Sequence, residues 1–384
     1  MRWWWGVVGF AFCLTTVAPS CNLYHRPWQS VKVGLVAPFS GRDHDVGEDM
    51  LNGVKLAIAE WNQRGGVNGY AIELVAQDDR ASAEGGRLQA QKMVTDGDVM
   101  GVIGHPANPS ALAALDVYHQ AGLAMLVVGA NAKALTAQSY PEAHLLSVQE
   151  DGLALTMAHF IRQTFGRQRV ALVGQVEGNE GLSMALEREL VAQGLTVVGN
   201  WTLADLQTGW EGVVTELTAK KAEVVVFLGD YLGGASLLSY LRGGGLLTPF
   251  LGGPTLARPD FVRLAGPAAE GAYYVTYAPE PPALTAQGER FTQQFQASTG
   301  LLPRQTAALA YDATNLLLQA LKAQTEGGNR PTRWGVVQML RQLGVQAGVS
   351  GRIAFDENGA NAGASVFLYR IEGATYPGRL VTFR

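Results

Sequence analysis

Short apolar runs alternate with amphipathic stretches along most of the chain. Within residues 47–62, Met50, Val54, Ile58 and Trp61 recur at the spacing of one helix face. The short apolar runs on either side of such stretches are typical of buried strands. This alternation predicts an α/β fold with a parallel sheet. The strands predicted in this first series cover residues 31–36, 71–76, 99–103 and 123–128.

A second series with the same rhythm begins after Asp151. It ends at residues 279–282, whose sequence Pro-Glu-Pro-Pro predicts a linker. At 384 residues the chain is too long for one ordinary core, so its length predicts two domains. The strands predicted after residue 151 cover 170–173, 196–198, 224–228, 249–251, 272–276, 351–355 and 365–370. The helices predicted there cover 153–164, 182–193, 212–220, 235–242, 260–264, 286–298, 306–323 and 333–343.

Two neighbouring strands of the first series end in polar, glycine-containing loops. The strand over 99–103 leads into residues 104–109, after which apolar residues recur at helical spacing; the strand over 123–128 ends at residues 129–131. Parallel strands deliver such loops to one edge of a sheet, where ligands bind in open α/β folds. The first loop opens into a helix, whose N-terminal N–H groups favour an anion such as a carboxylate. These two loops are therefore the candidate site.

Composition and motifs narrow the class of function. The chain is 47% hydrophobic and 16% charged, with a formal net charge of -4 and no basic run, so we expect no nucleic-acid partner. It contains no Gly-x-Ser-x-Gly, no phosphate-binding loop and no His-x-x-x-His spacing. We therefore expect neither an enzyme nor a resident cofactor or metal. The polar loop Asp43-His44-Asp45 could reach the ligand cleft or bind a metal, but the preferred interpretation is a solvated loop.

The N-terminus has the pattern of an export signal. Arg2 precedes an apolar span over residues 3–17, and small residues lead to Cys21. The span is shorter than the roughly 20 residues that a membrane-crossing helix needs. We interpret residues 1–20 as a signal peptide and 21–30 as a tether. Either Cys21 is lipidated, because it resembles the modified cysteine of bacterial lipoproteins, or the signal is simply removed after Ser20. We expect the mature protein in the periplasm or on the outer face of the cytoplasmic membrane.

Conspicuous segments follow one another from about Val31 to Tyr369. In chain order they read VKVGLVAPFSG, GEDMLNGVKLAIAEWNQRGGVNG, IELVAQDD, GVIGH, NEGL, PFLGG, AGPAAEG and IAFDENG. This series resembles the leucine/isoleucine/valine-binding proteins of bacterial ABC importers. The resemblance implies a type I periplasmic binding protein fold: two Rossmann-like lobes with parallel sheets, joined by a three-crossing hinge. It places residues 31–150 and 278–345 in lobe 1, and 151–277 and 346–384 in lobe 2.

The resemblance also implies which residues contact the ligand. The loops that clasp its carboxylate and amine fall on Asn108 and on Gly129, Ala130 and Asn131, with asparagine where the family usually has Ser and Thr. Asn108 has a second interpretation as a helix N-cap, because Pro109 follows it. Tyr231 matches an aromatic residue that touches the ligand from the second lobe; its alternative role is packing at a strand end. Further candidates are Ser110, Asp230 and Thr255.

Three features of the family pattern are absent. A family tyrosine appears as Gly178, and the acidic residue that usually pairs with the ligand's ammonium appears as Pro254. A buried ammonium without a counter-charge is costly, and Asp230 is the alternative source of that charge. The first-lobe disulfide of the family is lost, with Ala81 and Ala107 at its two positions.

The sequence leads to one main hypothesis and two alternatives. We expect an exported solute-binding protein that delivers a small carboxylate-bearing ligand to ABC permease subunits, with a neutral or branched-chain amino acid as the first choice. An amide, a urea-like compound or an aromatic acid is the alternative ligand. A periplasmic ligand sensor is the alternative function, because the same two-lobed fold serves receptors.

Overall fold

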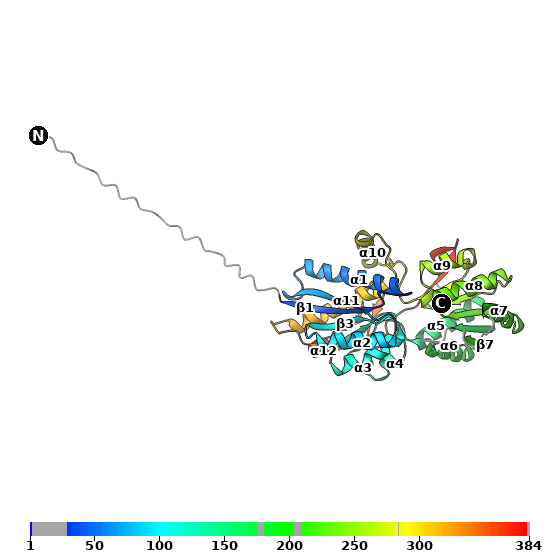
Figure 1. Cartoon of the computed structure of the whole chain (residues 1–384), viewed down its shortest axis with the longest axis horizontal. Helices are drawn as coiled ribbons and strands as arrows, with labels where there is room; N and C mark the ends of the chain where they lie inside the picture. Colours follow the sequence, from blue (N-terminus) through cyan, green and yellow to red (C-terminus); the bar gives the residue numbers. More distant parts are fainter. Residues whose placement is uncertain (2–28, 167, 175–179, 203–208, 283, 382–384) are drawn as a thin grey trace.

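The computed structural model describes Met1 and residues 29–166, 168–174, 180–202, 209–282 and 284–381. These residues form two lobes that lie side by side (Figure 1). The predicted signal peptide, Cys21 and Gly178 lie outside the described residues and stay predictions. Among the residues described, no helix is both long and apolar enough to span a membrane.

The first lobe is built on a five-stranded parallel sheet with the order β2-β1-β3-β4-β5. Every residue of β3 and β4 is buried, as expected for strands covered on both faces. In β1, Val33 and Leu35 pack in one apolar cluster with α1 and α11, while Val36 packs in another with α2 and α3. The strands are β1 (Ser30–Ala37), β2 (Ala71–Asp78), β3 (Val99–Gly104), β4 (Ala124–Val127) and β5 (Ala143–Leu145). The helices of this lobe are α1 (His44–Gln63), α2 (Ala83–Thr95), α3 (Asn108–Gln120), α4 (Ala134–Ala137), α10 (Ala286–Thr299), α11 (Gln305–Thr325) and α12 (Arg333–Gln342).

The second lobe contains a seven-stranded sheet with the order β14-β13-β10-β9-β8-β6-β7. Its strands are parallel from β7 to β10, and β13 and β14 add an antiparallel edge. The strands are β6 (Arg169–Gly174), β7 (Thr196–Thr202), β8 (Val224–Leu228), β9 (Phe250–Gly252), β10 (Tyr273–Thr276), β13 (Phe367–Glu372) and β14 (Thr375–Val381). The helices are α5 (Glu150–Phe160), α6 (Glu180–Ala192), α7 (Gly209–Ala219), α8 (Tyr231–Gly243) and α9 (Pro259–Ala265).

The chain passes between the lobes three times, as predicted. It crosses after β5, after β10 and before β13. The third crossing, however, lies later than the predicted boundary at residue 346. The small hairpin of β11 (Gln346–Ala347) and β12 (Arg352–Ile353) packs on lobe 1, because the backbone N–H groups of Val349 and Ser350 donate to the buried Asp312 carboxylate of α11. Leu145 of β5 also pairs with residues 359 and 360. Residues 346–361 therefore belong with the first lobe.

Two strands of the large sheets, β5 and β14, escape prediction for different reasons, as does the two-residue β11 of the small hairpin. β5 has three residues, too few to show a periodic pattern. β14 contains Pro377 and Gly378, which read as a turn in sequence but are tolerated in an edge strand. The predicted strand over 351–355 shrinks to the two residues of β12, outside both large sheets.

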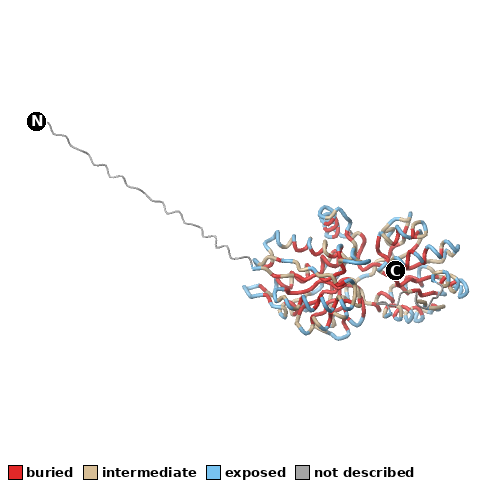
Figure 2. Tube along the Cα trace, viewed as in Figure 1, coloured by how far each residue is buried: buried red, intermediate tan, exposed pale blue. Residues whose placement is uncertain are grey.

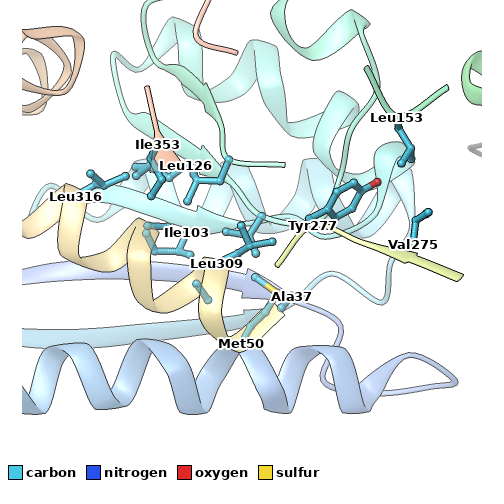
Figure 3. Packing of buried hydrophobic residues seen from close by; sticks show 14 of the residues in the cluster. Ala37, Met50, Ile103, Leu126, Leu153, Val275, Tyr277, Leu309, Leu316 and Ile353 are labelled. Carbon is cyan, nitrogen blue, oxygen red and sulfur yellow. The ribbon is translucent and has the colours of Figure 1, made fainter. Parts of the chain in front are cut away.

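The apolar core continues from one lobe into the hinge. Figure 2 shows a buried interior in each lobe under an exposed surface. The largest cluster contains Leu126 and Leu309 of lobe 1 together with Leu153, Val275 and Tyr277 around the crossings. Figure 3 shows Tyr277 between the lobe 1 residues and Val275. The hinge is thus a packed structure, which sets how the two site-bearing lobes face each other.

A buried carboxyl lies in the second crossing. Glu280 is 4% exposed, and its Oε1 accepts a hydrogen bond from the N–H of Gln305 at 3.2 Å. Its Oε2 has no hydrogen-bond partner among the described residues. Burial raises the pKa of Glu280 to about 8, although the Gln305 N–H and the charge of Arg304 act in the opposite direction. The folded hinge therefore favours the protonated side chain.

We expect Glu280→Gln to remove a pH dependence of stability. Because the folded pKa of Glu280, about 8, exceeds its unfolded value of 4.5, wild-type stability should fall as pH rises through that window. The variant should lose less stability over it and be more stable at about pH 8, by about 2 kcal/mol. Urea unfolding across the window measures this. Glu289→Gln, at an exposed site on α10, should follow wild type. Parallel profiles for wild type and Glu280→Gln would contradict the assignment.

Candidate functional site

The first site loop ends where α3 begins. The helix starts at Asn108, and its N-cap is Ala107, with extended backbone angles and no side-chain cap bond. Pro109 lies in the first turn. The N-cap interpretation of Asn108 is therefore wrong by one residue, and the side chain of Asn108 is directed to another partner.

That partner is the second site loop. Asn108 Oδ1 accepts hydrogen bonds from the N–H groups of Asn131 at 2.8 Å and Ala132 at 3.0 Å. Asn108 Nδ2 donates to Asn131 Oδ1 at 3.2 Å. Both asparagines are buried. The structure thus brings together two residues predicted for the site, and the oxygen of Asn108 satisfies two N–H groups of the kind expected to hold a ligand carboxylate.

Of the backbone N–H groups in the second loop, the described residues leave one for a ligand. Gly129 N–H donates to Ser147 Oγ at 2.9 Å. Gly129 has a φ of +96°, and an added Cβ would lie 3.2 Å from Pro106, so glycine is required there. Among the described residues, none accepts from the N–H of Ala130. Of the backbone N–H groups predicted to bind an anion in this loop, the described residues therefore leave that of Ala130 for the ligand.

Glu150, at the start of α5, makes hydrogen bonds that hold this loop. The sequence did not identify it as a site residue. Its N–H donates to the carbonyl of Asn131, and its Oε2 accepts from the N–H of Lys133, both at 3.1 Å. Burial raises the pKa of Glu150, while the N–H groups of Lys133 and Leu182 lower it. Since Leu182 is in α6, Glu150 connects the site loop of lobe 1 to lobe 2. An acid next to a predicted helix start is the only signal that the sequence carries for it.

Ser110 is enclosed in the interior of lobe 1. It is fully buried, and its hydroxyl is bonded to a carboxylate oxygen of Asp79 and lies 2.8 Å from His105 Nδ1. His105 Nε2 lies 3.0 Å from the hydroxyl of Tyr118, which is also fully buried. Burial alone would raise the pKa of Asp79, but the hydrogen bond and charge of His105 and the bond from Ser110 bring it below the usual value. This network stabilises the start of α3. Because the Ser110 hydroxyl is buried within it, the prediction that Ser110 contacts the ligand is wrong.

The predicted residues of lobe 2 cluster at the start of α8. Asp230 is its N-cap and accepts from the N–H of Gly233 at 2.7 Å. Arg42 of lobe 1 donates to the second oxygen of Asp230 at 2.6 Å. Thr255 Oγ donates to the carbonyl of Gly229 at 2.6 Å. Because Arg42 already neutralises Asp230, this carboxylate is a poor candidate for pairing with a ligand ammonium.

Tyr231 faces an arginine that the sequence did not identify. The guanidinium of Arg258 lies 4.6 Å from the centre of the Tyr231 ring. Arg258 also donates to Asp43 at 2.8 Å and to Asp45 at 3.2 Å, both in lobe 1. Residues 43–45, for which a solvated loop is the preferred interpretation of the sequence, thus make ion pairs with lobe 2. Within the part of the chain that the structure describes, no cluster of His, Cys, Asp and Glu is arranged to hold a metal.

Residues 30–375 match the family model described as periplasmic binding protein. The chain belongs to this family. The Leu/Ile/Val-binding protein of Escherichia coli K12 is 28% identical over 244 residues, which cover 63% of this chain. The match spans 66% of that relative's length, slightly under two thirds. The Leu/Ile/Val-binding protein homolog 2 of Brucella abortus 2308 is 26% identical over 349 residues, which cover 91% of this chain and 92% of the relative.

Solved structures share the architecture of this periplasmic binding protein. An ABC transporter substrate-binding protein from Desulfitobacterium hafniense in complex with Leu has a TM-score of 0.79 and 26% identity, covering 92% of this chain and 100% of that one. A branched-chain amino acid transporter substrate-binding protein from Streptococcus pneumoniae in complex with isoleucine has a TM-score of 0.83 and 20% identity, covering 92% and 99%. A solute-binding protein from Rhodopseudomonas palustris in complex with benzoate has a TM-score of 0.79 and 20% identity, covering 92% and 98%.

The comparisons confirm four expectations from the sequence. The fold is the two-lobed α/β fold of periplasmic binding proteins, and the resemblance to Leu/Ile/Val-binding proteins is real. The chain is a binding protein rather than an enzyme, because the family consists of binding proteins. Its place is outside the cytoplasm.

Proposed function

We propose that this periplasmic binding protein captures a neutral or branched-chain amino acid and delivers it to the permease subunits of an ABC importer. The observation that carries the proposal is the match to the Brucella abortus Leu/Ile/Val-binding protein homolog over 91% of this chain. The ligand lies between the two lobes. In lobe 1 it contacts the loop of Gly129, Ala130 and Asn131, whose shape Asn108 maintains; in lobe 2 it contacts Tyr231.

The charges around the cleft define the alternative ligand class. Ala130 N–H and the N-terminus of α3 favour a carboxylate. For the ammonium of an amino acid, Pro254 supplies no charge, and Asp230 is paired with Arg42. A ligand that keeps the carboxylate and lacks the ammonium avoids this cost. An aromatic acid, an amide or a urea-like compound is therefore the second candidate, and a similar structure from Rhodopseudomonas palustris holds benzoate.

Identification of the bound molecule tests this proposal. The protein is purified without added ligand, denatured, and its released small molecules are analysed by mass spectrometry. Calorimetric titration of the refolded protein with leucine, isoleucine, valine, benzoate and an aliphatic amide then measures the affinities. We expect saturable binding of a neutral amino acid. Binding of benzoate or the amide alone would overturn the amino-acid assignment, and binding of none would overturn the whole class.

The proposal extends to attachment at the membrane. We propose that the protein begins at Cys21 after export, that a lipid on Cys21 anchors it to the outer face of the cytoplasmic membrane, and that residues 21–30 form a tether. The mass of the mature N-terminal peptide tests this, since an unmodified terminus after cleavage at Ser20 would exclude the anchor.

A further inference from the structure

Three ion pairs join residues 42–45 of lobe 1 to lobe 2. Arg42 Nη1 lies 2.6 Å from Asp230, Arg258 Nη2 lies 2.8 Å from Asp43, and Arg258 Nη1 lies 3.2 Å from Asp45. Residues 42–45 lie between β1 and the first turn of α1 in lobe 1, whereas Asp230 begins α8 and Arg258 precedes α9 in lobe 2. We call these five residues the cleft ion-pair cluster.

The cluster is shielded from water most strongly at Arg258. The side chain of Arg258 is 10% exposed, and those of Asp43 and Asp45 are 27% and 29% exposed. Salt and water screen such partly buried pairs less than they screen surface pairs. Arg42 is half exposed, so its pair with Asp230 contributes less. Within the cluster, the bonds made by Arg258 therefore contribute most of the attraction between the lobes.

Each side of the cluster is held in place by its own lobe. In lobe 2, the ring of Tyr231 lies under the Arg258 guanidinium at 4.6 Å, a favourable cation–π arrangement. In lobe 1, Arg304 donates to Asp45 Oδ2 at 2.7 Å and to its backbone carbonyl. Arg258 and Asp45 are thus held by contacts within their own lobes, so little side-chain entropy is lost when these two residues pair.

We propose that the cleft ion-pair cluster is an electrostatic latch, and that Arg258 is a positioning residue that couples lobe closure to Tyr231. The three pairs bridge residues on opposite lobes, so opening the cleft breaks them. Part of the free energy of closure then comes from the protein itself rather than from the ligand. At low salt a closed population exists without ligand, and the apparent affinity rises with that population. Only the statement about affinity rests on the proposed function.

Ligand-free closure tests the latch without knowledge of the ligand. One label on each lobe reports the distance between lobes in the full protein at about 0.01 M and about 1 M salt, where the Debye length falls from about 30 Å to about 3 Å. We expect a closed population in the wild type that shrinks at high salt. Arg258→Gln should show little of it at either salt concentration. The matched control is Arg263→Gln, which breaks an exposed ion pair with Asp260 inside α9 and should behave like wild type.

A double-mutant cycle ensures that the latch stays falsifiable if Arg258→Gln fails to fold. Asp43→Asn and Asp45→Asn change the same contacts from lobe 1, where the side chains are partly exposed. Their effects on the closed fraction should be non-additive with Arg258→Gln, because residues in one network are coupled. Additive effects, or a salt-independent distance distribution shared by wild type and Arg258→Gln, would overturn the latch.

Affinity measurements distinguish a failure of the latch from a failure of the proposed function. With a ligand identified by mass spectrometry, Arg258→Gln should bind about tenfold more weakly than wild type at low salt, and the two affinities should converge at high salt. A purely structural role of Arg258 would lower affinity equally at both salt concentrations and would contradict the coupling. If the ligand-free protein closes with salt dependence and binds no amino acid, the proposed function fails while the latch stands.

Discussion

Replacing Asn108 by leucine is expected to lower ligand affinity about 100-fold, equivalent to about 2.7 kcal/mol. The Asn108 oxygen accepts from Asn131 N–H at 2.8 Å and Ala132 N–H at 3.0 Å, and leucine offers no acceptor for either. Two buried N–H groups would then lack partners, which costs about 1–3 kcal/mol each. The loop that presents Ala130 should shift or loosen, so both affinity and stability should fall. Calorimetric titration and urea unfolding measure the two effects.

Asn62 offers a matched control for this change. Its side-chain amide also ties a neighbouring backbone, donating to the carbonyl of Ile72 at 2.9 Å and accepting from its N–H at 3.0 Å. Ile72 lies near the start of β2, at the sheet edge opposite the site. Asn62→Leu should therefore reduce stability and leave affinity within about twofold of wild type. If Asn108→Leu and Asn62→Leu lower stability alike and neither affects binding, the loops joined by Asn108 are not the ligand site.

The sequence predicts the two site loops because their signals are local. β3 and β4 are short apolar runs at the core of a parallel sheet, and α3 follows a proline-containing loop. The resemblance then places Asn108 and Asn131 on those loops, and the structure brings them together. What stays hidden is the role of Asn108, because local capping and a contact with a loop 23 residues away use the same side-chain chemistry.

The ion pairs between residues 42–45 and lobe 2 could not be predicted, for a related reason. Arg258 and Asp43 are separated by 215 residues, and nothing in the composition of either segment specifies the other. A short polar loop is interpreted as solvated unless a partner is known. The pairing depends on how the two lobes are oriented by the hinge, and that orientation comes from packing around Tyr277 and Leu153. Long-range ion pairs therefore emerge only with the tertiary structure.

The largest loss of stability is expected from Asp79→Ala. The Asp79 carboxylate is fully buried and accepts from Ser110 Oγ and from the N–H of Ala81 at 3.0 Å, with His105 Nδ1 at 2.9 Å. Alanine removes the acceptor of the Ala81 N–H and leaves Ser110 and His105 with only each other at this position, in the buried interior. Breaking a buried polar network of this kind costs about 3–5 kcal/mol. Urea unfolding at neutral pH measures the loss.

The variant Asp78→Ala is the control for Asp79→Ala, because it removes a neighbouring carboxylate that is not part of the buried network. Asp78 is partly exposed and accepts from Phe39 N–H at 3.0 Å and Ser40 Oγ at 2.5 Å. Asp78→Ala should therefore cost about 1 kcal/mol. If Asp79→Ala costs no more than Asp78→Ala, the buried network does not stabilise the start of α3.

The acid limb of the stability curve gives an independent test of the same carboxylate. Burial raises the pKa of Asp79, but the bond and charge of His105 and the bond from Ser110 outweigh it, so the folded pKa lies below the unfolded value of 3.8. A depressed pKa contributes stability that is present above the unfolded pKa and is lost as pH falls through the folded one. Asp79→Asn removes that term, so its stability should decline less than that of wild type below about pH 4. Asp45 is another carboxylate of this kind: burial raises its pKa, but the charges of Arg258 and Arg304 outweigh burial and lower it. An equally steep acid decline in Asp79→Asn would mean that carboxylates such as Asp45, and not Asp79, account for the acid sensitivity.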